Sequence, residues 1–173
     1  MIADLQRLKQ IDKLKTVDDH LLIEKLEAIE TFIRGSYTNN KFYNRHIKFK
    51  AKSSNNKVLA VHPYLKVGDT IEIVESPNQG LYVIKEISET EMTLDKELFD
   101  FNSNYIIKVE YPADVKQGCL DMLEWVFGAK SKVGLKSETI SRHSVTYEDS
   151  ASFIDGYPVS LLGFLEPYRK MRF

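Results

Sequence analysis

Residues 69–95 read DTIEIVESPNQGLYVIKEISETEMTLD, and this stretch decides the fold class of the chain. Apolar side chains recur there at close to every second position, the period of a β-strand with one buried face. Pro77–Gly80 supplies the residues of a tight turn between two such runs. The stretch therefore predicts consecutive antiparallel strands. The apolar positions are Ile71, Ile73, Tyr82, Ile84, Ile87, Met92 and Leu94.

Similar short runs rich in Val, Ile, Thr, Tyr and Phe extend outward from this stretch on both sides. Five or six strands in a meander are enough for a small closed barrel, and closure removes the unpaired edges of the sheet. We therefore expect an inserted β-barrel over residues 45–111. The runs cover residues 45–51, 57–61, 69–75, 80–87, 90–95 and 104–110, and further turn signals lie at Ser53–Asn56, Val67–Asp69 and Asn102–Asn104.

The residues that flank the predicted barrel have a helical period instead. Ile2, Leu5 and Leu8 suggest a short opening helix. A longer helix is expected from an N-cap at Thr16, and Gly35 and the stretch Ser36–Asn40 should mark its end. A third helix should begin near Pro112 and end at Gly128. The apolar stripes of the two longer helices are Leu22, Leu26, Ile29, Ile33 and Tyr37, then Val115, Cys119, Met122, Leu123, Val126 and Phe127.

A strand is expected at Ser144–Glu148, followed by a short last helix around residues 161–165 that Pro167 limits. The whole pattern predicts an α+β fold. A small helical domain of three to four helices, residues 1–44 and 112–173, carries the small β-barrel as an insertion at residues 45–111. Such an insertion has its own core, so the helical scaffold does not depend on it.

Composition restricts the possible functions. Hydrophobic residues make up 43% and charged residues 28% of the chain, which is typical of a globular protein. The formal net charge is -1, so the chain lacks the basic excess of a protein that wraps nucleic acid. The single cysteine excludes an internal disulfide and fits a reducing compartment. No apolar run is long enough for a signal peptide or a membrane span, so we expect no membrane contact.

The residues that usually carry chemistry are not arranged for it. The four histidines, His20, His46, His62 and His143, include no pair at the spacing of a helical metal site. Cys119 falls on the apolar face of a predicted helix, where cysteine acts as a small hydrophobe. We therefore predict no metal, no cofactor and no catalytic residue. A small hydrolase is a third hypothesis, for which no residues can be nominated.

Two segments are candidates for binding. Lys130, Lys132 and Lys136 lie in a loop that holds only one acidic residue up to residue 142. This loop either contacts phosphates or an acidic partner, or is simply exposed to solvent. The final residues Tyr168–Phe173 are cationic and aromatic. Such a segment often docks on a partner, and the alternative is a tail packed on its own domain.

Several of these segments resemble a known family. Ser144-Val-Thr-Tyr147, Tyr157-Pro158 and Leu161–Lys170 resemble the C-terminal half of the head–tail connector proteins of long-tailed bacteriophages, also called adaptor or head-completion proteins. Asp18–Gly35 is similar to their N-terminal helix, and residues 113–128 to their central helix. The resemblance covers roughly residues 1–44 and 112–173, and the insertion departs from the minimal family pattern.

The resemblance implies a structural virion protein that is assembled in the cytoplasm of the bacterial host. Such proteins form a ring, typically of twelve copies, below the portal protein, although a copy can be monomeric in isolation. The ring extends the DNA channel, through which DNA passes without sequence-specific binding, and it receives a stopper or tail-completion protein.

The resemblance also assigns roles to the two candidate segments. The family's C-terminal segment tends to engage the portal, which here implies Arg169, Lys170, Met171, Arg172 and Phe173. Lys130, Lys132 and Lys136 would face the DNA channel or a neighbouring subunit.

The alternative function is a nucleic-acid-binding module that uses the small β-barrel. Residues 45–111 hold nine basic and ten acidic residues. The predicted strands lack an evident stripe of basic and aromatic residues, which argues against this alternative.

Overall fold

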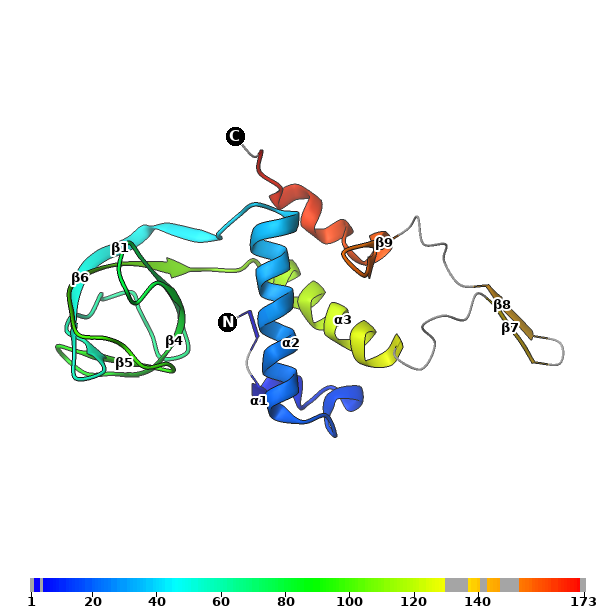
Figure 1. Cartoon of the computed structure of the whole chain (residues 1–173), viewed down its shortest axis with the longest axis horizontal. Coiled ribbons are helices and arrows are strands. Elements are labelled where there is room, and N and C mark those ends of the chain that lie inside the picture. The colour runs from blue at the N-terminus through cyan, green and yellow to red at the C-terminus, as the bar shows by residue number, and fades with distance from the viewer. Residues whose placement is uncertain (1, 4, 130–136, 141–142, 147–152, 172–173) are drawn as a thin grey trace. The chain divides into compact units, whose positions relative to one another are not determined.

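The computed structural model describes residues 2–3, 5–129, 137–140, 143–146 and 153–171. The predicted α+β fold is confirmed, because the chain combines a set of helices with a closed barrel of six strands (Figure 1). The chain divides into two compact units. Residues 41–111 form the barrel unit, and residues 2–40 together with 112–173 form the helical unit.

All strand pairs of the barrel are antiparallel, and the order β1-β2-β5-β4-β3-β6 closes because β6 also pairs with β1. The alternating apolar residues of the stretch 69–95 point inward, and Ile71, Ile73 and Ile84 are fully buried. Sequence alternation therefore produced the core of the barrel. The strands are β1 Tyr43–Ser54, β2 Lys57–Val58, β3 Thr70–Val74, β4 Gly80–Ile87, β5 Met92–Leu94 and β6 Phe101–Val109.

The β1–β2 connection is the tight turn that the sequence predicts. Asn55 and Asn56 both have positive φ, 50° and 63°. A two-residue hairpin turn with this geometry matches the twist of the flanking strands, and asparagine tolerates it better than most side chains.

The turn predicted at Asn102–Asn104 is wrong, since these residues belong to β6. Asn104 is fully buried, and its side-chain amide donates to the Ala51 carbonyl (3.3 Å) and to Ser53 Oγ (2.9 Å). The residue is asparagine because it serves a buried polar network, which overrides its usual preference for turns.

Asn78 stands at the centre of this network. Its amide nitrogen donates to Ser53 Oγ (3.1 Å), to the Phe99 carbonyl (2.9 Å) and to Asn104 Oδ1 (3.0 Å). Its amide oxygen accepts from the Phe99 backbone N–H at 2.7 Å. One side chain therefore joins the β3–β4 turn to β1, to β6 and to the segment that enters β6.

In the helical unit α2 packs against α3, so the stretches that precede and follow the barrel in the sequence share one core (Figure 1). Most of the predicted stripe residues are buried, since Leu22, Leu26, Ile29 and Ile33 on α2 and its continuation, and Val115, Cys119, Met122 and Leu123 on α3, are almost inaccessible. Tyr37, Val126 and Phe127 at the ends of the stripes are partly exposed. The helices are α1 Leu5–Leu8, η1 Asp12–Leu14, α2 Asp19–Thr31, η2 Phe32–Tyr37, α3 Ala113–Ala129, η4 Val159–Leu161 and η5 Gly163–Tyr168.

Two short hairpins complete the described part of this unit. β7 Ser137–Ile140 pairs with β8 His143–Thr146, and β9 Phe153–Ile154 pairs with β10 Tyr157–Pro158. β8 confirms the strand expected at Ser144–Glu148 as far as Thr146, and its last two residues lie outside the described residues.

The start of α2 differs from the sequence prediction. Asp18 is the N-cap, because its carboxylate accepts a hydrogen bond from the Leu21 N–H at 3.1 Å. Thr16 lies two residues too early. The Val17 N–H still donates to the Leu14 carbonyl, so this segment completes the turn after η1.

The same helix ends within the predicted stretch Ser36–Asn40. Gly35 lies inside η2, a π-helix that runs to Tyr37, and the Thr38 N–H donates to the Ile33 carbonyl at 3.1 Å. The left-handed residue that stops the helix is Asn39, with φ 50°. Asn39 belongs to the stretch Ser36–Asn40 that the sequence predicted as the end of the helix, whereas Gly35 does not end it.

Pro167 lies within η5, although it was expected to limit the last helix. The backbone hydrogen bonds of this 3-10 helix join residues three positions apart, and they do not need an N–H group from the proline. Leu165 N–H donates to the Leu162 carbonyl (2.9 Å), and Arg169 N–H donates to the Glu166 carbonyl (3.3 Å).

Candidate assembly surface

The C-terminal segment, defined here as residues 168–171, is attached to the end of η2 by its backbone. The Lys170 N–H donates to the Thr38 carbonyl at 2.7 Å. The side-chain amide of Asn39 donates to the Met171 carbonyl at 3.1 Å. These bonds depend on the left-handed turn at Asn39, so the residue that ends the helix also holds the segment.

Tyr168 fixes the other end of the segment. Its hydroxyl lies 2.8 and 2.9 Å from the two carboxylate oxygens of Asp114, at the start of α3, and its carbonyl accepts from the Asn40 amide at 3.2 Å. The hydrogen bond to Asp114 raises the pKa of Tyr168 above its ordinary value. The segment is thus tied to both long helices of the unit.

Glu166 connects the segment to Tyr37. The Tyr37 hydroxyl donates to Glu166 at 2.6 Å, Arg169 lies 3.2 Å from the same carboxylate, and the Arg169 guanidinium lies 5.3 Å from the Tyr37 ring centroid. The hydrogen bond from Tyr37 and then the contact with Arg169 lower the pKa of Glu166. Arg169 is therefore held on its own unit by an anion and an aromatic ring.

This pKa shift gives a pH-dependent prediction. A carboxyl group whose pKa is lowered by folding stabilises the folded state above its ordinary pKa, here 4.5, and loses that contribution as the pH falls through its folded pKa. The Tyr37→Phe variant should raise the midpoint of the Glu166 titration towards 4.5, measured by carboxyl-carbon NMR. A midpoint that Tyr37→Phe leaves unchanged would contradict the contact.

Phe164 anchors η5 directly on α3 at Gly118. A Cβ atom at Gly118 would lie 2.3–2.5 Å from three atoms of the Phe164 ring, far inside van der Waals contact. Only glycine allows the ring to approach the helix backbone this closely.

Substitution of this glycine should loosen the C-terminal segment. We expect Gly118→Ala to displace the Phe164 ring and to cost about 1–3 kcal/mol of unfolding free energy. Gly128→Ala is the matched control, because a Cβ there meets nothing within 4 Å. Amide hydrogen exchange at Lys170 should quicken only in the first variant, and equal exchange in both would refute the packing.

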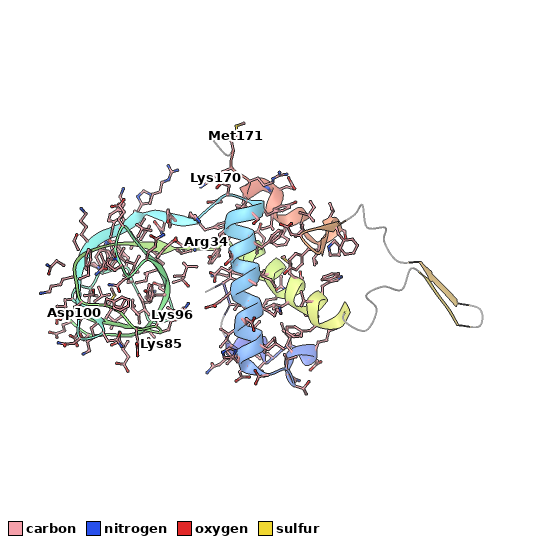
Figure 2. The ribbon with its side chains drawn as sticks, viewed as in Figure 1. Arg34, Lys85, Lys96, Asp100, Lys170 and Met171 are labelled. Carbon is pink, nitrogen blue, oxygen red and sulfur yellow. The ribbon has the colours of Figure 1, made fainter. Side chains whose placement is uncertain are left out.

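The predicted site residues fall into two groups. Arg169, Lys170 and Met171 lie on the anchored segment, and Met171 is 79% exposed at its end (Figure 2). The remaining predicted residues, Arg172, Phe173, Lys130, Lys132 and Lys136, lie outside the described residues. The structure therefore brings together part of the predicted C-terminal site, and its portal-binding role stays a prediction.

Sequence reasoning missed an aromatic cluster near β9 and β10. The Trp125 ring lies 6.0 Å from Phe153 and 6.1 Å from Tyr157, and Tyr157 lies 5.2 Å from Phe32. Phe153, Ile154 and Val159 remain partly exposed. The rings come from three separate stretches of the chain, η2, α3 and the β9–β10 hairpin, so no local pattern could have revealed the cluster.

The chemistry-bearing residues behave as follows. Cys119 is buried, and burial raises the pKa of its thiol well above the ordinary range, with a further contribution from nearby Glu30. Among the described residues, no group of three or more His, Cys, Asp and Glu side chains is placed to hold a metal ion. None of the helices in the described ranges has the length and apolar character needed to cross a membrane.

The barrel carries a second surface, a set of exposed basic side chains on β1 without aromatic residues among them. We define the β1 basic face as Arg45, Lys48, Lys50 and Lys52, all of them exposed. The near balance of charge over residues 45–111 concealed this segregation.

No protein-family model matches the chain, and no curated protein is significantly similar to it.

Proposed function

We propose that the chain is a structural subunit of the head–tail connector of a long-tailed bacteriophage. It would form a ring of copies, twelve in the family that it resembles, below the portal protein. Two features support this proposal. The stretches that resemble connectors are the two that fold together as the helical unit, and that unit presents an anchored segment with an exposed apolar end.

The observation that carries the proposal is the state of the C-terminal segment. Its backbone is hydrogen-bonded to Thr38 and Asn39, yet the Met171 side chain is 79% exposed. Holding a segment in place before binding reduces the entropy that docking costs. Burial of Met171 in a partner would then contribute hydrophobic free energy with little ordering cost.

A ring needs a second, different patch on each subunit, because neighbours in a ring meet through unlike surfaces. The helical unit offers one in the partly exposed apolar residues Phe153, Ile154 and Val159. We propose that the C-terminal segment docks on the portal, and that these residues contact a neighbouring copy or a stopper or tail-completion protein.

Sedimentation of the chain with portal rings from the same phage tests the proposal. The wild-type chain should co-sediment, and Met171→Asp should weaken binding by about tenfold or more, because it places a charge in a desolvated contact. Val67→Asp is the matched control, since Val67 is also exposed (62%) but lies in the barrel unit. Failure of the wild-type chain to bind would refute the function, and equal binding by both variants would refute the docking site.

A further inference from the structure

The positive charge of the barrel unit is concentrated in one strand. Residues 45–57 hold five basic and no acidic residues, whereas residues 58–111 hold four basic and ten acidic residues. A random distribution of the same charges would not isolate one sign in this way. The first strand of the barrel therefore differs from the others in its electrostatics.

The period of β1 directs these charges outward. Ile47 and Ala51 are buried, and Lys48, Lys50 and Lys52 between and beyond them are exposed. Successive lysines on one face of a strand lie about 7 Å apart. Lys48, Lys50 and Lys52 of the β1 basic face thus form a row of cations with a spacing close to that of neighbouring phosphates along a nucleic-acid strand.

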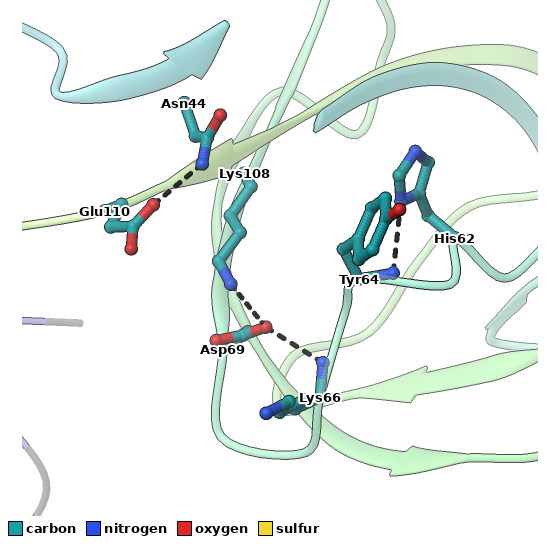
Figure 3. Close-up of polar contacts among 7 residues, drawn as sticks. All are labelled: Asn44, His62, Tyr64, Lys66, Asp69, Lys108 and Glu110. Carbon is teal, nitrogen blue, oxygen red and sulfur yellow. Dashed lines mark hydrogen bonds and ion pairs between the residues drawn. The ribbon is translucent and has the colours of Figure 1, made fainter. Parts of the chain in front are cut away.

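Two other lysines of the barrel unit form ion pairs with carboxylates. Lys108 lies 2.8 Å from Asp69, and Lys57 pairs with Glu91 (Figure 3 shows the first pair). In contrast, the side chains of the β1 basic face form no ion pair with any described residue. The β6 residues opposite Lys48 and Lys50 are Ile107 and Tyr105, which carry no charge.

A chain of ring contacts begins at the same strand. Phe49 lies between Lys48 and Lys50 in sequence but packs against the barrel core, and its ring lies 5.7 Å from the His62 ring in a stacked arrangement. The His62 ring lies 5.7 Å from the Tyr64 ring in a tilted arrangement (Figure 3 draws these two rings). Tyr64 ends this chain of contacts and is 71% exposed. An exposed ring supported from behind is the usual platform for an unpaired base.

We propose that the β1 basic face binds the phosphodiester backbone of nucleic acid, and that Tyr64 stacks with a base of a single strand. Binding would be weak, dependent on salt and indifferent to sequence, because the contacts are to phosphates. The inference concerns the barrel unit alone and stands whether or not the helical unit belongs to a connector. A regular row of cations favours a regular row of phosphates over the uneven charges of an acidic protein.

Fluorescence anisotropy of the full chain with labelled DNA of about 20 nucleotides tests this, with single-stranded and duplex probes. The test variant replaces Lys48, Lys50 and Lys52 with glutamine. The matched control replaces Lys66, Lys85 and Lys96, which are exposed on the same unit, with glutamine (Figure 2 labels two of them). Both variants lose the same charge, so only position separates them.

With three phosphate contacts, the wild-type chain should bind duplex roughly 40-fold more weakly when salt is raised from about 50 to about 200 mM. The test variant should lose most of that salt dependence and bind about tenfold more weakly at low salt, while the control stays within about twofold. Tyr64→Ala should weaken binding to the single strand about fivefold and leave duplex binding nearly unchanged.

Several outcomes would overturn the inference. Equal loss in the two lysine variants would mean that only net charge matters. Absence of binding by the wild-type chain at low salt would exclude the site. Tighter, β1-dependent binding to polyglutamate than to DNA would assign the face to an acidic protein. If Tyr64→Ala has no effect on the single strand, the phosphate contacts stand and the base-stacking role of Tyr64 is lost.

Discussion

Replacing Asn78 with alanine is expected to lower the unfolding free energy of the barrel unit by about 3–4 kcal/mol. Asn78 is 3% exposed, and its side chain makes four hydrogen bonds that join β1, β6 and two loops. The variant leaves the Phe99 N–H without its acceptor, whereas the Phe99 carbonyl keeps the hydrogen bond from the Ser53 hydroxyl, and Asn104 Oδ1 loses a buried donor. The cost of such unsatisfied groups exceeds the net value of the bonds themselves.

Asn102→Ala is the control for this variant, since it makes the same chemical change at an exposed position of the same unit. It should change stability by less than about 0.5 kcal/mol. The methyl signals of Ile84 and Ile106 report the barrel by NMR during denaturation. A loss at Asn102 as large as that at Asn78 would show that the polar network does not hold the barrel together.

Replacing Leu26 with alanine is expected to lower the unfolding free energy of the helical unit by about 3 kcal/mol. Leu26 is fully buried on α2, and cavities of this kind cost about 2–5 kcal/mol. The only tryptophan, Trp125, lies on α3, so its fluorescence reports the stretch that follows the barrel in the sequence. A shift of the Trp125 transition would show that the two stretches unfold together.

Leu21→Ala is the matched control, because Leu21 lies on the same helix and is only half-buried. It should cost clearly less than Leu26→Ala. The barrel signals of Ile84 and Ile106 should not move in either variant. A Trp125 transition that Leu26→Ala leaves in place would contradict a single helical scaffold.

Periodicity explains why the fold class was predictable from sequence. The alternation of Ile71, Ile73 and Ile84 reports burial directly, because a strand must place successive side chains on opposite faces. The apolar stripe on α3 predicted the buried face of that helix for the same reason, with a period of three to four residues. These patterns predict which face is buried, and the core followed from them.

The errors share a physical cause, which is that polar residues have more than one use. Asn104 was taken as a turn residue but completes a buried network, and Asn39, within the stretch Ser36–Asn40 that was expected to end the helix, also holds the Met171 carbonyl. The partners of both residues are distant in sequence. Local preference gives way where tertiary hydrogen bonds are available.

The candidate site was predictable only in part. The cationic and aromatic composition of Tyr168–Phe173 drew attention to the segment, but no pattern showed that Lys170 would bond to Thr38. The β1 basic face could have been found, because Lys48, Lys50 and Lys52 recur at period two in a predicted strand. Counting charge over the whole barrel, rather than strand by strand, concealed it.

The connector proposal as a whole is tested most directly by electron microscopy of this chain mixed with portal rings of the same phage. A closed ring of copies added to one end of the portal, with an open central channel, is the expected result. Portal particles that stay unchanged in the presence of excess folded protein would contradict the proposed function.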